Sequence, residues 1–437
     1  MDEDSESERE IMTAEIRTLS AKAGELVHEL GAMTASVYDG LADPFAQRAL
    51  ENIGAHLRSE GSELREAVAA PKSASGVAVV RGLVVDHAVA GPTPAGWRAV
   101  DERMLSPLDA SLALLAAIAG RPFAWAGQQD GRLVNNILPE PGKEHEQTGA
   151  SSSVLLAPHT EDAFHPDRAN LLMLLCVRNP QQVPTTVASV RRARISESDQ
   201  RVLSERVVPI LPDDSYDWDR SLPSLPVATL WERHDGLAMR YDPAYTPLAE
   251  ASAEYQAAYR RLGEALAEVS EAVVLEPGDM AIIDNDVAVH GRAPFTARYD
   301  GTDRWLKRVN VSFSPAPAAL GTRRSNTATA RRSWMTSPRP RTCWQASCEP
   351  SGRGDRPERE RSRRGGDHPF RGDRRRGSGL PGARGGPFGQ SAQAQHHQRP
   401  LDQLRHAGQN GRRGGVQDLL HQQRDRGEAL LHHLGPL

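Results

Sequence analysis

The strongest constraint on folding is an abrupt change of composition near residue 320. Residues 321–437 contain no Ile, no Tyr, no Lys and a single Val, while Arg, Gly, Pro, Gln and His dominate. Such a segment cannot bury enough apolar surface to offset the conformational entropy that folding removes. Charge changes as well: residues 323–437 hold 23 Arg against 10 Asp and Glu, whereas residues 1–322 hold 30 Lys and Arg against 47 Asp and Glu.

We therefore expect a folded domain at 11–320, preceded by a disordered acidic tail at 1–10 and followed by a disordered Arg/Gly-rich tail at 321–437. Three interpretations of the second tail are open. The preferred one is a frameshift product. GC-rich coding DNA that is read out of frame yields an amino-acid sequence of this composition, and the tail directly follows a complete-looking domain. The alternatives are a disordered extension without a specific role and an Arg/Gly-rich segment that binds nucleic acid.

Cysteine usage and hydropathy indicate the compartment. Cys176, Cys343 and Cys348 form no disulfide framework, which fits a reducing compartment. No apolar run approaches the length of a membrane span, and residues 1–8 are acidic where a signal peptide would be basic and then apolar. These features predict a cytoplasmic protein that binds no membrane. Because nucleic-acid binding is not the preferred interpretation of the tail, we expect no nucleic-acid partner; the oligomeric state stays open.

Helix-like and strand-like segments follow one another along the domain. Residues 11–33 and 44–70 show the apolar spacing of helices, a buried helix is expected at 108–118, and an amphipathic helix at 252–269. Strands are expected at 76–85, 171–177, 185–190, 272–275, 280–284 and 304–313. A Glu-Pro-Gly-Asp turn joins two of these strands, 272–275 and 280–284, into a hairpin-like pair.

Helices followed by many short strands are typical of a mainly β fold with flanking helices, in which two antiparallel sheets form a barrel. We place the helical part at 11–74 and the barrel core at 75–315. A barrel of this kind can bring residues from distant strands to one mouth.

Two histidines and a glutamate form a candidate iron site. His159 and Glu161 are two apart, which in a strand places both side chains on one face, and His290 ends an apolar segment far downstream. A His-x-carboxylate pair plus a distant His is the facial triad of non-haem iron(II) oxygenases, which leaves coordination positions open. A His-x-Glu pair alone also occurs by chance in a chain of this length.

An arginine at a suitable distance strengthens the case for this site. Arg304 follows His290 by fourteen residues. Its guanidinium could hold the far carboxylate of a 2-oxo acid through two parallel hydrogen bonds. The alternative for Arg304 or Arg308, taken singly, is a surface salt bridge.

Several motifs together resemble one enzyme family. The matching segments are 128–131, 144–147, 159–166, 178–180, 210–214, 240–243, 278–285, 290–292, 294–295 and 300–308. The chain resembles the clavaminate synthase-like branch of the Fe(II)/2-oxoglutarate-dependent dioxygenases over about residues 75–315. Within this branch it is most similar to the arginine β-hydroxylases of peptide antibiotic biosynthesis.

The resemblance implies a double-stranded β-helix (jelly-roll) core and the cofactors Fe(II), 2-oxoglutarate and O2. It implies that His159, Glu161 and His290 bind iron, with no catalytic residue beyond these ligands. It also implies that Arg304 and Thr186 bind 2-oxoglutarate. The reaction would give hydroxyarginine, succinate and CO2.

The resemblance extends to the amino acid substrate. Gln128 and Glu161 would hold its α-amino group, and Arg308 would lie near its α-carboxylate. A cationic side chain in a closed pocket must meet carboxylates, because an unpaired buried charge is very costly. Asp213 and Asp235 match two acidic positions of the arginine hydroxylases.

The substrate assignment leaves alternatives open. Arg233 stands where the arginine hydroxylases have a third acidic residue, and Asp213 could be an ordinary helix-cap or turn aspartate. Lysine, asparagine, homoarginine or a carrier-bound residue are therefore alternative substrates. Two further alternatives do not involve an active enzyme. The chain could be an inactive frameshifted oxygenase, or an RNA-binding protein with a vestigial oxygenase domain.

Overall fold

The structure, a computed structural model, describes residues 14–59, 62–101, 106–216, 225–313 and 340–342. The tail predicted at 1–10 lies outside these residues, as does all of the tail at 321–437 except the short strand at 340–342. Both tails therefore stay predictions.

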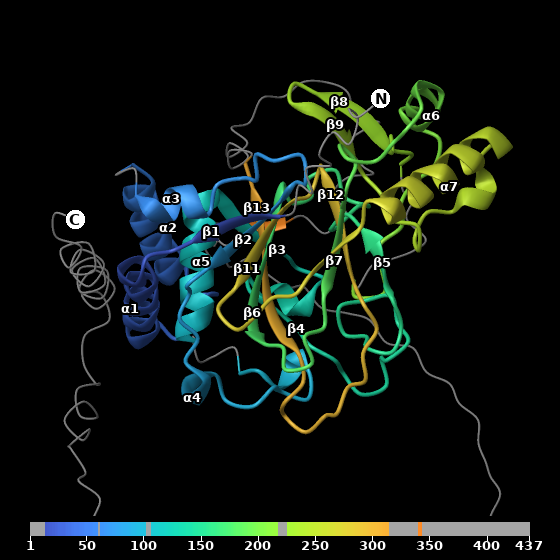
Figure 1. The fold of residues 1–437 in the computed structure, drawn as a ribbon. Helices are drawn as coiled ribbons and strands as arrows, with labels where there is room; N and C mark the ends of the chain where they lie inside the picture. Colours follow the sequence, from blue (N-terminus) through green and yellow to red (C-terminus); the bar gives the residue numbers. More distant parts are fainter. Residues whose placement is uncertain (1–13, 60–61, 102–105, 217–224, 314–339, 343–437) are drawn as a thin grey trace, which may run out of the picture. The chain divides into compact units, whose positions relative to one another are not determined.

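Two sheets form the core of the described fold (Figure 1). The larger sheet has the order β1 (Glu15–Thr18), β2 (Val77–Arg81), β11 (Met280–Asp284), β6 (Leu171–Arg178), β13 (Trp305–Ser312), β3 (Arg121–Trp125) and β14 (Pro340–Thr342), with β4 (Asn135–Ile137) also paired to β13. The smaller sheet has the order β10 (Glu271–Val273), β7 (Thr185–Ser189), β12 (Ala288–Arg292) and β5 (Leu156–His159). A separate hairpin joins β8 (Leu230–Arg233) to β9 (Gly236–Met239). The predicted mainly β, jelly-roll architecture is confirmed.

The central strand β6 shows why the larger sheet is apolar on both faces. Leu171, Met173 and Leu175 pack into a cluster with helical side chains, whereas the alternating Leu172 and Leu174 pack against side chains of the smaller sheet. Successive strand residues point to opposite faces, so a strand covered on both sides needs an unbroken apolar run. The run at 171–177 therefore marks a strand in the middle of the molecule rather than at its surface.

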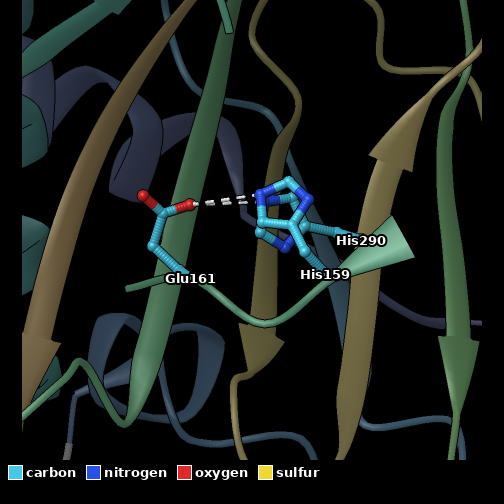
Figure 2. A group of neighbouring side chains, drawn as sticks. All are labelled: His159, Glu161 and His290. Carbon is cyan, nitrogen blue, oxygen red and sulfur yellow. Dashed lines mark ion pairs between the residues drawn. The ribbon is translucent and has the colours of Figure 1, made fainter. Parts of the chain in front are cut away.

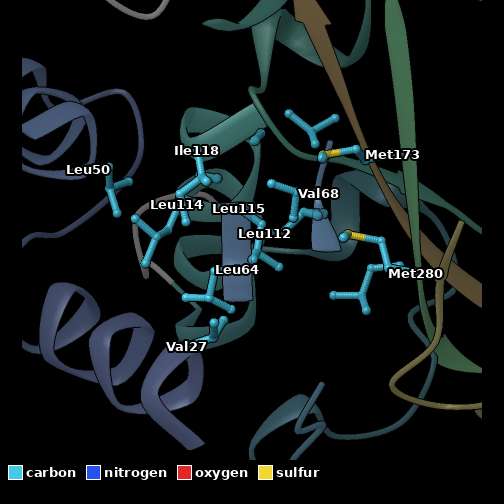
Figure 3. Packing of buried hydrophobic residues seen from close by; sticks show 14 of the residues in the cluster. Val27, Leu50, Leu64, Val68, Leu112, Leu114, Leu115, Ile118, Met173 and Met280 are labelled. Carbon is cyan, nitrogen blue, oxygen red and sulfur yellow. The ribbon is translucent and has the colours of Figure 1, made fainter. Parts of the chain in front are cut away.

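Helices cover the outer faces of the two sheets. The helices are α1 (Ala21–Val37), α2 (Pro44–Ser59), α3 (Glu63–Ala67), α4 (His87–Ala90), α5 (Pro107–Ala119), α6 (Glu197–Leu203) and α7 (Ala253–Glu268), with 3-10 turns at Trp97–Ala99, Gln129–Gly131 and Leu248–Glu250. In Figure 3, Leu112 and Leu115 of α5 lie among apolar side chains that include Met173 and Met280 of the larger sheet. On the smaller sheet, Tyr255 and Leu262 of α7 pack with Val289 of β12.

Two expectations about local structure are wrong. Within the segment predicted to be helical from residue 11, residues 15–18 form strand β1, which pairs in parallel with β2. Helix α1 starts at Ala21, after Ser20 caps it. Strands β10 and β11 form no hairpin, because β10 joins the smaller sheet and β11 the larger one. The turn between them thus carries the chain from one sheet to the other. Gly278 adopts φ +89° in this turn, and a Cβ there would lie 2.3 Å from the Leu83 carbonyl oxygen.

Within the described part of the chain, none of the helices is long and apolar enough to cross a membrane.

Candidate metal centre

Neighbouring strands of the smaller sheet bring the predicted ligands together. His159 ends β5, and the register of the sheet places His290 of β12 directly opposite it. Glu161 lies two residues beyond the end of β5. One potential ligand atom from each of the three side chains lies within 4.8 Å of the others, and Figure 2 shows the carboxylate of Glu161 directed at both rings.

The donor atoms point toward one position. The Nδ1 atom of His159 lies 2.8 Å from the Ala157 carbonyl oxygen, so Nδ1 carries the proton and Nε2 keeps its lone pair. The Nε2 atoms of His159 and His290 lie 4.0 Å and 3.4 Å from Oε2 of Glu161. Two imidazole nitrogens and one carboxylate oxygen suit a divalent iron, since both ligand types bind first-row metals.

Protonation also fits metal binding. Burial by itself would raise the pKa of Glu161, but the neighbouring Arg308, His290 and His159 lower it to about 2. Burial and the nearby His159 lower the pKa of His290 to about 4. At neutral pH the site therefore offers a carboxylate and a neutral imidazole, which are the protonation states that a metal requires.

The two oxygens of Glu161 have different surroundings. Oε1 forms an ion pair with Arg308 at 2.5 Å, and the other guanidinium nitrogen of Arg308 donates to Asn135 at 2.9 Å. Oε2 is buried and accepts no hydrogen bond from the residues described. An orphaned buried carboxylate oxygen is costly unless something binds it, and a metal held by the two histidines would do so.

A cavity of about 230 Å³ lies beside the three ligands. It is lined by Gln128, Asp213, Arg304 and Arg308, which are four of the residues predicted to bind cosubstrate or substrate. These residues come from three separate parts of the sequence. The cavity therefore has the composition expected of one site for two charged small molecules.

Two buried arginines in this cavity lack acidic partners. Neither Arg292 nor Arg304 forms an ion pair within the described residues. Burial lowers the pKa of both to about 10, and the charge of Arg304 adds to this effect on Arg292. The two terminal nitrogens of Arg292 donate to Ser151 and to the carbonyl oxygens of Ser152 and Val154, so neutral groups accept their hydrogen bonds. Arg304 has fewer partners, which leaves it suited to an anionic ligand.

The threonine that lies beside Arg304 is the neighbour of the one predicted from the sequence. Thr185, rather than Thr186, accepts a hydrogen bond from Arg304 at 3.0 Å and lines the cavity. The register of β7 and β12 explains this, because Val187 lies opposite His290 and Thr186 opposite Gly291. Thr185 and Val187 thus share the face of His290, while Thr186 points to the other face. Thr185, rather than the predicted Thr186, is therefore the threonine that lies beside Arg304 in the cavity.

Hydrogen bonds connect the segment that contains Asp213 to residues in and beside the cavity lining. Gln128 donates to the Ser215 hydroxyl at 3.3 Å, and the backbone N–H of Ser215 donates to Asp213 at 2.7 Å. The Tyr216 hydroxyl donates to Asp162, the residue after the ligand Glu161. Desolvation raises the pKa of Asp213, whose side chain lines the cavity, and the charge of Glu161 adds to this effect.

Asp235, which was also predicted to bind the substrate, does not line this cavity. It occupies the turn between β8 and β9, outside the cavity lining. Arg191 and Arg233 form ion pairs with it at 2.9 Å and 2.8 Å and lower its pKa to about 2. Arg233, which stands at the expected third acidic position, pairs in addition with Asp284 and Asp286 and also lies outside the cavity.

Sequence reasoning missed a second acidic residue near the metal ligands. Asp242 is buried, and its pKa is raised to about 6 by burial and by the charge of Asp213, against the effect of His159. One of its oxygens accepts the backbone N–H groups of Ala244 and Tyr245. Its signal was available, because residues 240–243 are among the segments that carry the family resemblance.

The sequence matches known proteins over this same region. The profile of the family described as taurine catabolism dioxygenase TauD, TfdA family matches residues 38–310. An enduracididine beta-hydroxylase of Streptomyces hygroscopicus is 39% identical over 264 residues, which are 54% of this chain and 77% of the relative. An L-ornithine/L-arginine 3-hydroxylase of Catenulispora acidiphila is 36% identical with the same coverage.

Solved structures share the fold. The non-haem iron oxygenase OrfP, in complex with Fe, succinate and (3R,4R)-dihydroxy-L-Arg, is 36% identical with a TM-score of 0.61, covering 68% of this chain and 94% of that structure. An asparagine oxygenase in complex with Fe(II), 3-hydroxyasparagine and succinate is 33% identical, also with a TM-score of 0.61, covering 68% and 93%. The profile spans more than half of the chain and includes all three candidate ligands, so this protein belongs to the TauD/TfdA family of dioxygenases.

Proposed function

We propose that this chain is an Fe(II)/2-oxoglutarate-dependent hydroxylase of a free cationic L-amino acid, with L-arginine at Cβ as the first candidate. The observation that carries the proposal is one cavity in which a His-Glu-His set lies beside Arg304, a buried cation without an acidic partner in the described structure. The relatives that act on arginine, ornithine and enduracididine support the choice of substrate.

The protein's own contribution is to bind and position the reactants. His159, Glu161 and His290 would hold the iron, and Arg304 with Thr185 would hold the distal carboxylate of 2-oxoglutarate. Bound iron, with 2-oxoglutarate and O2, supplies the oxidising power that hydroxylates a C–H bond and leaves succinate and CO2. The cavity walls orient the substrate carbon and exclude water.

A cationic side chain would meet the carboxylate of Asp213, with the buried carboxylate of Asp242 behind the cavity lining. Asp213 lines the cavity, and Asp242 is close enough for the two charges to raise the pKa of Asp242. Asp213 is half-buried and Asp242 is buried, and the repulsion between these two neighbouring carboxylates is relieved when a guanidinium or ammonium binds near them. A neutral side chain such as that of asparagine would leave this repulsion in place.

Replacement of Asp213 by asparagine is expected to raise the KM for arginine by about 30-fold or more, because one partner of a buried charged hydrogen bond is lost. The matched control is Asp235→Asn, which removes a carboxylate outside the cavity and should leave the KM unchanged. The assay supplies Fe(II), 2-oxoglutarate and, in turn, L-arginine, L-ornithine, enduracididine, L-lysine and L-asparagine. Mass spectrometry then measures the gain of one oxygen.

Two results would count against the proposal. If no amino acid gains oxygen or stimulates succinate formation, the substrate class is wrong. If asparagine is the best substrate and Asp213→Asn leaves every KM unchanged, the cavity does not select a cation.

A threonine pair tests the cosubstrate contact. Thr185→Val removes the acceptor of the Arg304 hydrogen bond and is expected to raise the KM for 2-oxoglutarate by about tenfold. Thr186→Val makes the same chemical change on the opposite face of β7 and should leave that KM unaltered. Equal effects of the two substitutions would contradict the assignment of Thr185.

Two finer parts of the proposal rest on the sequence alone. The sparse cysteines support a cytoplasmic location, and the family resemblance supports a role in peptide antibiotic biosynthesis.

A further inference from the structure

We propose that Asn285 is a positioning residue that fixes the backbone of Glu161 and thereby sets the affinity of the site for its metal. The inference rests on the proposed iron centre and adds a residue to which no role was assigned above. It starts from a gap in the sheet: β5 ends at His159, so the strand ladder that orients this histidine does not extend to Glu161.

The side chain of Asn285 replaces the missing strand partner. Its Oδ1 atom accepts the backbone N–H of Glu161 at 2.7 Å, and its Nδ2 atom donates to the Glu161 carbonyl oxygen at 2.9 Å. A primary amide that meets both backbone groups of one residue reproduces the paired hydrogen bonds of an antiparallel neighbour. Asn285 is 0% exposed, so water does not compete for these bonds.

Asn285 also connects Glu161 to the strand of the third ligand. Its Nδ2 atom donates to the Ala169 carbonyl oxygen at 3.0 Å, and its backbone N–H donates to the Asn170 carbonyl oxygen at 2.9 Å. It follows β11 directly and stands three residues before the start of β12, which carries His290. One side chain therefore links the segment after His159 to the turn that leads into His290.

The same hydrogen-bond pattern occurs at a second asparagine, where none of the residues that it binds is a metal ligand. Asn179 accepts the Val183 N–H at 2.9 Å and donates to the carbonyl oxygens of Val183 and Leu275, each at 3.1 Å. Asn179 is also buried, and neither it nor its partners line the cavity. Asn179 thus controls for the loss of stability that follows when such a clamp is removed.

The test compares Asn285→Asp with Asn179→Asp. Each substitution keeps the shape and the Oδ1 acceptor but places an oxygen against two carbonyl oxygens, so both variants should lose stability to a similar extent in chemical unfolding. Calorimetric titration with Mn(II), without 2-oxoglutarate, measures metal affinity. Asn285→Asp is expected to weaken metal binding by about 10- to 100-fold, as removal of an outer partner of a metal ligand typically does. Asn179→Asp should bind as the wild type does.

Asn285→Ser provides a second, uncharged variant that loses the clamp without adding a carboxylate, and it should weaken Mn(II) binding in the same way. If either Asn285 variant binds Mn(II) as tightly as the wild-type protein, the role assigned to Asn285 is overturned while the proposed function stands. If the wild-type protein binds no metal, the iron centre itself is wrong.

Discussion

Replacing His290 by alanine is expected to abolish 2-oxoglutarate turnover while leaving the fold intact. The substitution removes one of three ligand atoms that lie within 4.8 Å of one another and leaves a His-x-Glu pair, which is too few ligands to hold iron firmly. His290 is buried in β12 between β5 and β7, so the strand pairing persists without its ring. Succinate release measures turnover, and far-UV circular dichroism measures the fold.

A histidine near the cavity but outside the ligand set serves as control. His145 is exposed and lies beside the lining residues Glu146 and Gln147, so His145→Ala should retain turnover. Metal titration of His290→Ala locates the defect, because the expected loss is in binding. Succinate formation at the wild-type rate by His290→Ala would refute the ligand assignment.

The second large effect is expected at Arg304. Replacing it by methionine should raise the KM for 2-oxoglutarate by about two orders of magnitude, because a buried charged hydrogen bond to the cosubstrate is lost. The cosubstrate-free protein should be no less stable, since its guanidinium is buried without an ion-pair partner in the described residues. KM measurements and thermal unfolding without cosubstrate test the two parts separately.

Arg304→Lys separates charge from geometry. Lysine keeps the positive charge but cannot form the two parallel hydrogen bonds of a guanidinium, so its KM should lie between those of the wild type and the methionine variant. An unchanged KM in Arg304→Met would show that the distal carboxylate binds elsewhere, with Arg292 as the next candidate because it lines the same cavity.

Features that depend on short motifs or on the pattern of apolar residues could be predicted from the sequence. The ligands His159, Glu161 and His290 could be found because each stands in a recognisable segment, and the structure brings them together. The strand at 171–177 was equally clear, because both of its faces are covered and its apolar run is unbroken.

The structure differs from the predictions where the position of a residue depends on the strand or the side chain with which it pairs. Thr185 and Thr186 are chemically identical, and only the register against β12 shows which one faces His290. Asp235 looked like a substrate ligand, but Arg191 and Arg233 neutralise it in a turn. The hairpin expected at 272–284 failed because β10 finds its partner in β7, about ninety residues earlier in the chain.

The placement of the site across two sheets has a consequence for newly made protein. His159 and His290 belong to the smaller sheet, whereas Arg304 directly precedes β13 of the larger one. In a chain whose two sheets have not yet packed together, the histidines could bind metal. Arg304 would not yet be in place to bind 2-oxoglutarate, which supplies the electrons for the reaction with oxygen. We therefore expect oxygen activation to require that both sheets have packed together, so that metal bound by a partly folded chain would not start the reaction.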